Sequence, residues 1–153
     1  MPNLYLMQHG EAAPEEKDPS RPLTPSGRAA VERVANRARS AGAQLDLCIH
    51  SGKLRAAQSA EVLASVMGAT AEQRDGLAPN DPVGPIAGWA RRTAGPVAIV
   101  GHQPFLGKLL SFLVAGDEGA EILRFTMGGL VCLIPRDASG RFSVAWALPA
   151  ELA

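Results

Sequence analysis

The chain contains three histidines, and each lies at or just after the end of an apolar run. His9 follows "NLYLMQ", His50 ends "LDLCIH", and His102 follows "PVAIVG". Short apolar runs between polar segments are typical of buried strands. A histidine at a strand end can be a buried residue with one satisfied hydrogen bond. It can also be a nucleophile, because its pKa lies near neutrality and leaves an unprotonated ring nitrogen.

Arginines near two such histidines would suit phosphoryl transfer, which needs positive charge and N–H donors around the phosphoryl oxygens. Arg55 lies in "SGKLRAAQ", at the start of a predicted helix, and Arg21 lies in the loop after His9. One histidine would attack phosphorus, while the other histidine and an arginine would neutralise the oxygens. For Arg21, a solvated loop position is an equal alternative.

The apolar runs predict five strands, and the segments between them predict four helices. The strands are expected at residues 3–7, 45–50, 96–101, 130–135 and 142–148. The helices are expected over residues 26–40, 53–67, 85–92 and 104–116.

This alternation of strands and helices predicts a three-layer α/β/α fold with a mainly parallel central sheet and helices on both faces. The last two strands flank the short turn "DASG" and predict a C-terminal antiparallel hairpin. Ligands of parallel sheets bind outside the carboxyl ends of the strands. The segments 8–10, 50–52 and 101–103 should therefore meet at one edge of the sheet.

Two of the helices have predicted ends and predicted buried faces. Thr24 is the expected N-cap of the first helix, with Pro25 in its first turn, and Gly68 is the expected stop of the second. The buried positions are expected to be Ala29, Ala30, Val34, Ala38 and Ala41 in the first helix, and Leu54, Ala57, Val62 and Met67 in the second.

The composition is that of a globular protein with one domain over residues 1–153. Its 15 basic and 15 acidic residues give no formal net charge, which argues against a nucleic-acid-binding or basic membrane-surface protein. Cys48 and Cys132 are expected to be buried, reduced thiols. The start has no basic leader and no run is long enough to span a membrane, so a cytoplasmic location is expected. Neither a metal site nor a cofactor is expected, because no carboxylate cluster or histidine pair has ligand spacing.

Four segments in order, "HGEA", "RPLTPSGR", "SGKLRAAQSAE" and "VGHQPFLG", resemble the histidine phosphatase superfamily, which has the phosphoglycerate mutase-like fold. The size of the chain and its "RPLT" element are similar to the SixA-type phosphohistidine phosphatases. This resemblance implies that His9 is the nucleophile that becomes phosphohistidine. It also implies that Arg55 grips the phosphoryl group, that His102 donates to its oxygens, and that Arg21 helps to bind phosphate or a phosphorylated partner.

Two neighbours of the proposed nucleophile complete the expected phosphate site. Gly10 is expected to be small because the backbone must turn sharply there. Gln8 departs from the arginine of the family's RHG pattern: its amide offers two N–H donors but no charge. Losing one such stabilising contact costs about 3–4 kcal/mol. Lys53 could restore charge or could be solvated, and Glu11 could orient a neighbour or be an exposed loop acid.

A second departure concerns the acid that protonates the leaving group in many relatives. The corresponding loop, "RDGLAPNDPVG", has no glutamate, and Asp75 and Asp81 are its nearest acids. Phosphohistidine needs less help from an acid than a phosphate ester does, because its leaving nitrogen is readily protonated. The missing acid therefore favours phosphohistidine over sugar phosphates.

The function expected from the resemblance is a metal-independent hydrolase of phosphoric monoesters or phosphoramidates that acts through a phosphohistidine intermediate. The substrate would be phosphohistidine in a partner protein, or a small phosphorylated compound. The alternative is a non-catalytic module that binds phosphate or a phosphoprotein and is weakened by Gln8. A mutase or sugar phosphatase is less favoured, because little chain is left for the large substrate-covering insertions of those relatives.

Overall fold

A six-stranded sheet with the order β3-β2-β4-β1-β5-β6 forms the middle of the structure, a computed structural model that describes residues 1–153. The strands are β1 (Leu4–Gln8), β2 (Leu47–His50), β3 (Thr70–Gln73), β4 (Val97–Gly101), β5 (Leu130–Pro135) and β6 (Phe142–Leu148). The pairs β3–β2, β2–β4 and β4–β1 are parallel, whereas β5 is antiparallel to both β1 and β6. The predicted sheet, with its antiparallel C-terminal pair, is confirmed.

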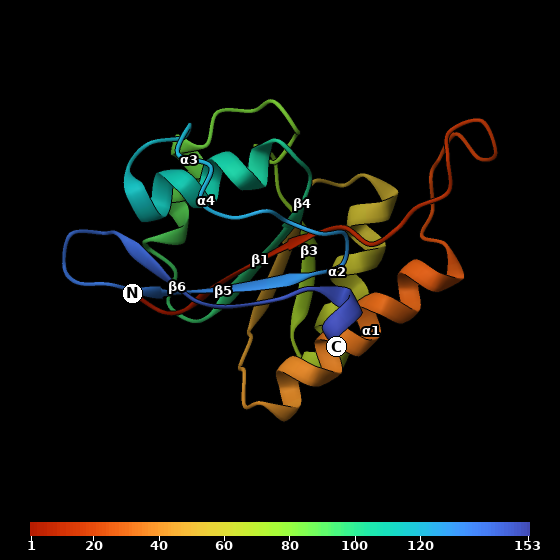
Figure 1. Cartoon of the computed structure of the whole chain (residues 1–153), viewed down its shortest axis with the longest axis horizontal. Helices are drawn as coiled ribbons and strands as arrows, with labels where there is room; N and C mark the ends of the chain where they lie inside the picture. Colours follow the sequence, from red (N-terminus) through yellow and green to blue (C-terminus); the bar gives the residue numbers. More distant parts are fainter.

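Helices cover both faces of this sheet (Figure 1). One face carries α1 (Pro25–Ser40) and α2 (Leu54–Met67), and the other carries α3 (Gly84–Ala90) and α4 (Phe105–Ala115). A short 3-10 helix, η1 (Ala150–Leu152), ends the chain beside α1. None of these helices combines the length and the apolar character that crossing a bilayer would require.

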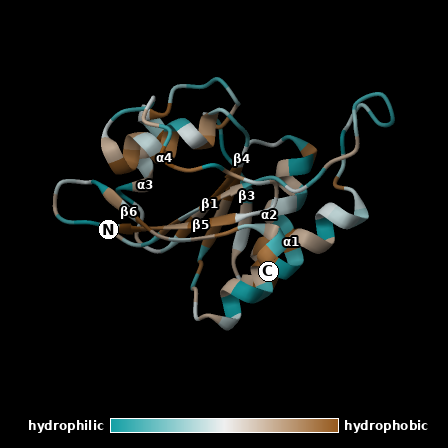
Figure 2. Ribbon diagram, viewed as in Figure 1, coloured by the Kyte–Doolittle hydropathy of each residue, from teal (hydrophilic) through white to brown (hydrophobic).

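Each face of the sheet has its own apolar core, and strand β1 contributes to both. Leu4 and Leu6 pack toward α3 and α4, whereas Tyr5 and Met7 pack toward α1 and α2. This division follows from the two-residue period of a strand, whose side chains alternate between faces. Figure 2 shows the hydrophobic residues concentrated in the central strands and the hydrophilic ones on the outer helix faces and the loop after β1. Cys48 and Cys132 are buried free thiols, as predicted.

Strand β3 is the one strand that the apolar pattern did not predict; the short helix η1 was not predicted either. Its four residues, Thr70–Gln73, are exposed or only half-buried. The strand lies at the edge of the sheet, where it pairs with β2 alone. A strand with little buried surface gives no apolar signal, so its existence depends on backbone pairing.

The predicted buried faces of α1 and α2 were partly wrong. In α1 the buried residues are Gly27, Val31, Val34, Ala35 and Ala38, so Val34 and Ala38 were predicted correctly while Ala29 and Ala41 are exposed. Alanine occurs on both sides of this helix and does not mark a face, whereas the two valines do. In α2 the side chain of Leu54, the first residue of the helix, is 38% exposed.

The start of α1 is attached closely to the segment that follows β1. The Thr24 hydroxyl accepts a hydrogen bond from Gly27 N (2.9 Å) and donates one to Glu11 Oε1 (2.7 Å). Thr24 is therefore the N-cap, as predicted. Gly27 lies so close to the main chain of Glu11 that a Cβ atom there would overlap the Glu11 carbonyl oxygen. This contact holds helix α1 against the segment that carries His9 and Gly10.

We expect Gly27→Ala to lower the free energy of unfolding by about 1–3 kcal/mol, although alanine is normally the better helix former, because its methyl group has no space. Urea denaturation measures this change. The matched control is Gly84→Ala at the start of α3, where a Cβ would meet nothing within 4 Å. The control should leave stability unchanged or slightly higher, and equal effects of the two substitutions would contradict the role given to Gly27.

Candidate active site

The three histidine-bearing strand ends meet at one edge of the sheet, as predicted. Strands β1 and β2 both pair in parallel with β4, which places Gln8 beside Gly101 and His50 beside Val100. Beyond the last strand pair, His9 N donates a hydrogen bond to the Gly101 carbonyl (3.0 Å). This bond joins the two segments that carry His9 and His102, both of which belong to the sequence motifs.

His9 and His102 face each other at this edge, with ring centroids 5.3 Å apart and planes inclined by 52°. His9 Nδ1 lies 2.7 Å from the carbonyl oxygen of Gly10. A carbonyl oxygen only accepts hydrogen bonds, so Nδ1 carries the ring proton and Nε2 keeps a free lone pair. Burial is the main cause that lowers the pKa of His9, and the charges of Arg55 and Arg21 add to it against the Gly10 hydrogen bond. The ring is therefore uncharged at neutral pH, with the lone pair of Nε2 available.

His102 has the opposite arrangement of its ring nitrogens. Its Nε2 lies 2.6 Å from Ser51 Oγ, which also accepts a longer hydrogen bond from Lys53 N (3.4 Å). Nε2 is the only acceptor within the protein for the Ser51 hydroxyl hydrogen, and on this basis we assign the ring proton of His102 to Nδ1. Burial, followed by the charges of His9, Arg55, Lys53 and Arg21, lowers the pKa of His102 to about 4. His102 is therefore a neutral N–H donor.

Arg55 lies in the first turn of α2, and a chain of hydrogen bonds joins this turn to the nucleophile segment. Gly10 N donates to Ser59 Oγ (2.9 Å), and the Ser59 hydroxyl donates to the Arg55 carbonyl (2.7 Å). Ser59 is completely buried. The position of Arg55 relative to His9 is thus set by groups inside the protein.

Two buried donors at this edge have no hydrogen-bond partner: Arg55 Nε and His102 Nδ1. Buried polar groups without partners are uncommon and call for an explanation. Both groups carry a hydrogen here and both need an acceptor. An oxyanion between Arg55 and His102 would supply acceptor oxygens to both, next to the free Nε2 of His9.

Arg21 reaches the same region, which a solvated loop arginine would not. Its charge lowers the pKa of His9, of Arg55 and of His102. Its backbone has a φ of 50°, in the left-handed region that residues with side chains rarely adopt. Its Nε donates to the Ala13 carbonyl (3.1 Å). Strained residues of this kind are concentrated at functional sites.

Gln8 and Gly10 flank His9 in the chain, Gly10 as the RHG pattern has it and Gln8 in place of its arginine. Gln8 is half-buried, and its carbonyl accepts a hydrogen bond from Gly128 N (2.9 Å). Gly10 is small for a different reason than predicted, since its φ is not positive. A Cβ atom there would lie 2.9 Å from Val31 Cγ2 and 3.0 Å from the Gly27 carbonyl oxygen. Close packing against α1, rather than a sharp turn, explains this glycine.

Ser59 and Gln58 were not predicted as part of the site region, and Ser51 was expected at this edge only as part of the segment 50–52, with no role given to it. Gln58 Oε1 accepts a hydrogen bond from Leu23 N (2.7 Å) and so attaches the "RPLT" loop to α2. All three lie in or beside the segment "SGKLRAAQS", so the motif contained them. Their roles depend on hydrogen-bond partners that are far away in sequence, and spacing alone does not reveal such partners.

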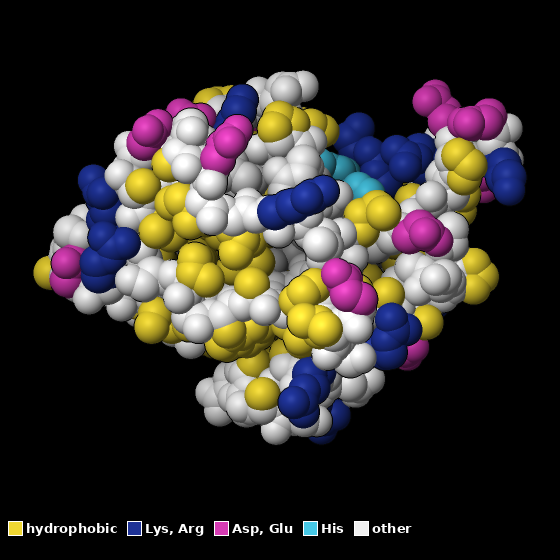
Figure 3. All heavy atoms as spheres, in the orientation of Figure 1, with side chains coloured by type: hydrophobic (Ala, Val, Ile, Leu, Met, Phe, Trp, Pro, Cys, Tyr) yellow, Lys and Arg dark blue, Asp and Glu magenta, His cyan; other side chains and the backbone are white.

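The other polar candidates have partners elsewhere. Glu11 accepts from the Thr24 hydroxyl, and Asp81 Oδ2 accepts from Ala78 N (2.9 Å) within its own loop. His50 Nδ1 accepts from Gly52 N (3.1 Å), and burial lowers the pKa of His50 while Glu61 acts against this. No three His, Cys, Asp or Glu side chains are grouped so that they could hold a metal ion. Figure 3 shows histidine atoms at the surface beside a group of Lys and Arg side chains, near the loop that carries Asp and Glu at its tip.

Comparison with known proteins agrees with this geometry. Residues 4–81, which include His9, Arg21 and Arg55, match the family model of the histidine phosphatase superfamily (branch 1). The chain belongs to the histidine phosphatase superfamily. An uncharacterized protein of Picosynechococcus sp. is 36% identical over 127 residues, which cover 78% of this chain and 77% of that protein. The resemblance expected from the four motifs is confirmed.

Solved structures of the superfamily extend the match to nearly the whole chain. The protein histidine phosphatase SixA in complex with tungstate superposes with a TM-score of 0.84 and 25% identity, over 97% of each chain. A SixA protein of Agrobacterium tumefaciens superposes with a TM-score of 0.76 and 25% identity, over 96% of this chain and 97% of that one. Histidine phosphatases include phosphatases and mutases, so phosphoryl chemistry is the activity of the family.

NMR titration of the histidine ring signals tests the proton positions in the site. We expect His102 to titrate with a pKa of about 4, and saturating phosphate to raise this pKa, because a bound anion favours the imidazolium. Below pH 6.5 the unfolded chain then binds this proton more readily than the folded one. The free energy of unfolding should therefore fall as the pH drops from 6.5 toward 4.

Ser51→Ala is the matched variant for this titration. Without the hydroxyl that donates to Nε2, the ring proton should distribute between both nitrogens, which ¹⁵N chemical shifts detect. A His102 that titrates near 6.5 in the phosphate-free protein would contradict the burial argument.

Proposed function

We propose that this chain is a metal-independent phosphatase that removes the phosphoryl group from phosphohistidine in a partner protein, with His9 as the covalent nucleophile. The observation that carries the proposal is the pair of unpartnered buried donors, Arg55 Nε and His102 Nδ1. They flank a histidine whose Nε2 has a free lone pair. The site thus combines a nucleophile with donors for the oxygens of the group that it attacks.

The reaction would run in two displacements. In the first, the Nε2 lone pair of His9 forms a bond to phosphorus while the bond between phosphorus and the leaving nitrogen breaks. That nitrogen keeps the electron pair and takes a proton from solvent. In the second, water attacks phospho-His9, inorganic phosphate leaves, and the lone pair returns to His9. In both steps the phosphoryl oxygens carry the negative charge. They would be held by Arg55, Arg21 and the N–H of His102.

Two observations support phosphohistidine as the substrate rather than a phosphate ester. The protein histidine phosphatase SixA superposes on 97% of this chain at 25% identity. In addition, the loop after β3 has no glutamate, and Asp81, one of its two aspartates, accepts the Ala78 N–H within its own loop. Solvent can protonate the imidazole ring of phosphohistidine before the bond to phosphorus breaks, whereas an ester oxygen is too weakly basic for this. A phosphoramidate therefore depends less on an acid supplied by the site.

We further infer that residues 1–153 work as one domain in the cytoplasm. The superposition on SixA involves nearly the whole chain rather than one half. Two buried cysteines that remain free thiols fit a reducing compartment.

The test is a phosphate-release assay on three substrates: a phosphohistidine carrier protein, a phosphoaspartate receiver protein and an aryl phosphate. We expect the phosphohistidine carrier to be hydrolysed with the highest kcat/KM. His9→Ala should lose at least about 10³-fold in kcat and should no longer form the acid-labile phosphoprotein. His50→Ala is the matched control. It removes a histidine at the same edge of the sheet, but one that does not belong to the group formed by His9, His102 and Arg55. Turnover by His9→Ala at the wild-type rate would overturn the proposal.

Gln8→Arg tests whether the neutral amide limits the rate. An added guanidinium would stabilise the phosphoryl oxygens in the transition state, so we expect kcat/KM to rise at least about tenfold. Gln8→Lys is the control that adds charge without the bidentate fork, and it should gain less. If the wild type binds phosphate without turnover and only Gln8→Arg hydrolyses the carrier, the chain is a phosphate-binding module instead. Unchanged or lower activity in Gln8→Arg would mean that the site is built around glutamine.

A further inference from the structure

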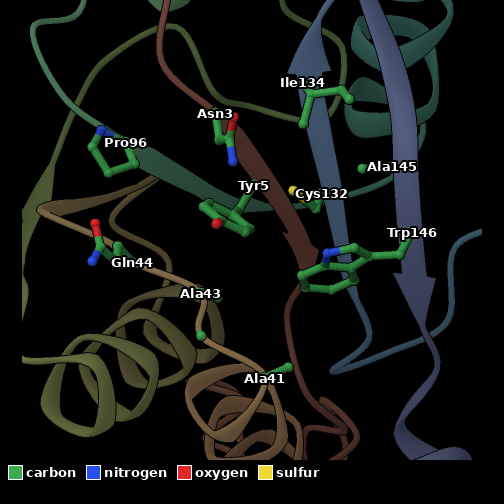
Figure 4. A pocket seen from close by; sticks show the side chains of 11 residues that line it. Asn3, Tyr5, Ala41, Ala43, Gln44, Pro96, Cys132, Ile134, Ala145 and Trp146 are labelled. Carbon is green, nitrogen blue, oxygen red and sulfur yellow. The ribbon is translucent and has the colours of Figure 1, made fainter.

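A second hollow lies on the α1 and α2 face of the sheet, beside the start of β1, whereas His9 follows the end of this strand. Its volume is about 350 Å³, within the range of small-molecule sites. Figure 4 shows its floor, formed by Tyr5 and Trp146 from the sheet, and its wall, formed by the loop that follows α1. The lining residues are Asn3, Tyr5, Ala41, Gly42, Ala43, Gln44, Pro96, Cys132, Ile134, Ala145 and Trp146.

A β-bulge places Trp146 in this hollow. Cys132 pairs with Trp146 but Leu133 pairs with Val144, so Ala145 is an extra residue in β6. Without it, the two-residue period would put Val144 and Trp146 on the same face. With it, Val144 packs toward α3 and α4 while Trp146 packs on the opposite face, with its ring centroid 6.1 Å from that of Tyr5. Bulges of this kind often aim a side chain at a site.

The polar groups of the hollow are all uncharged. The Asn3 and Cys132 side chains and the Gln44 main chain lie close enough to the Tyr5 hydroxyl to influence its pKa, which burial raises. Figure 4 also shows the indole nitrogen of Trp146 on the side of Cys132 and Tyr5. None of the 11 lining residues is Lys, Arg, Asp, Glu or His.

Other hollows on the surface differ in this respect. One beside α4 is lined by Lys108, Glu118, Glu121 and Arg124, and one between α1 and α2 by Arg28, Glu32 and Glu61. A charged ligand would lose its hydration in the hollow at Tyr5 without gaining a counter-charge. Tyr5 is 4% exposed and Trp146 is half-buried, so a flat, uncharged molecule would lie against the Trp146 ring and meet only the exposed edge of Tyr5.

From these features we propose that the hollow at Tyr5 and Trp146 is a binding site for a small, uncharged aromatic or heteroaromatic molecule with a polar edge. The site is separate from the phosphate pocket and does not depend on the function proposed for it. Tyr5 and His9 are four positions apart in the chain, about 13 Å along a strand. A ligand at Tyr5 would therefore bind without displacing a phosphoryl group at His9.

The test uses benzamide and benzoate, which have the same shape but differ in charge. In ¹H–¹⁵N spectra, benzamide should shift the Trp146 indole signal in a saturable way, with a dissociation constant on the order of 1 mM. Benzoate should bind at least about tenfold more weakly. The indole signal of Trp89, which lies on α3 under Arg74, should not move and serves as the internal control.

Two variants locate the binding. Ala41→Phe fills the mouth of the hollow from an exposed position and should weaken benzamide at least about tenfold. Ser40→Phe, one residue away but not in the lining, should leave it unchanged. Tyr5→Phe should weaken it about two- to tenfold through loss of the hydroxyl. No shift of the Trp146 signal, equal binding of benzoate, or full binding by Ala41→Phe would each overturn the proposal.

Discussion

The parallel register between β1 and β4 is the constraint on which the rest of the site depends. It sets Gln8 beside Gly101, and the next hydrogen bond, from His9 N to the Gly101 carbonyl, brings the two facing histidines out of the sheet together. A slip of one residue in this pairing would turn every side chain of β1 to the other face. The two apolar cores prevent that slip, because Leu4 and Leu6 fit one of them and Tyr5 and Met7 fit the other. The stability of the sheet and the geometry of the site therefore have the same origin.

Around this register, small residues and neutral hydrogen bonds do most of the positioning. Gly10 and Gly27 let the segment that carries His9 approach the rest of α1, and Ser59 connects this segment to the carbonyl of Arg55. None of these contacts involves a charged side chain. The cations of the site are thus held by neutral groups and keep their charges for a ligand. In agreement with this, the Nε of Arg55 has no hydrogen-bond partner in the protein.

Much of this could be predicted from the sequence, and the failures have physical causes. Strands β1 and β4 are buried on both faces and appear as continuous apolar runs, whereas the exposed β3 has no such pattern. Alanines on both sides of α1 hid its buried face. The histidines and arginines of the site could be predicted because they lie in segments that match the family's motifs in the same order. The proton positions on His9 and His102 depend on Gly10 and Ser51, and only coordinates show those contacts.

The neutral state of His102 has a consequence for how the pocket responds to its surroundings. Because burial keeps the pKa of this ring at about 4, its protonation does not change near neutrality. The positive charge at this edge of the sheet then comes from arginines, which do not titrate in the physiological range. A phosphate group, in contrast, loses its second proton near pH 6. Near neutrality a change in acidity would therefore leave the charge of the His102 ring unchanged in the phosphate-free protein, while it would change the ionisation of a phosphate ligand.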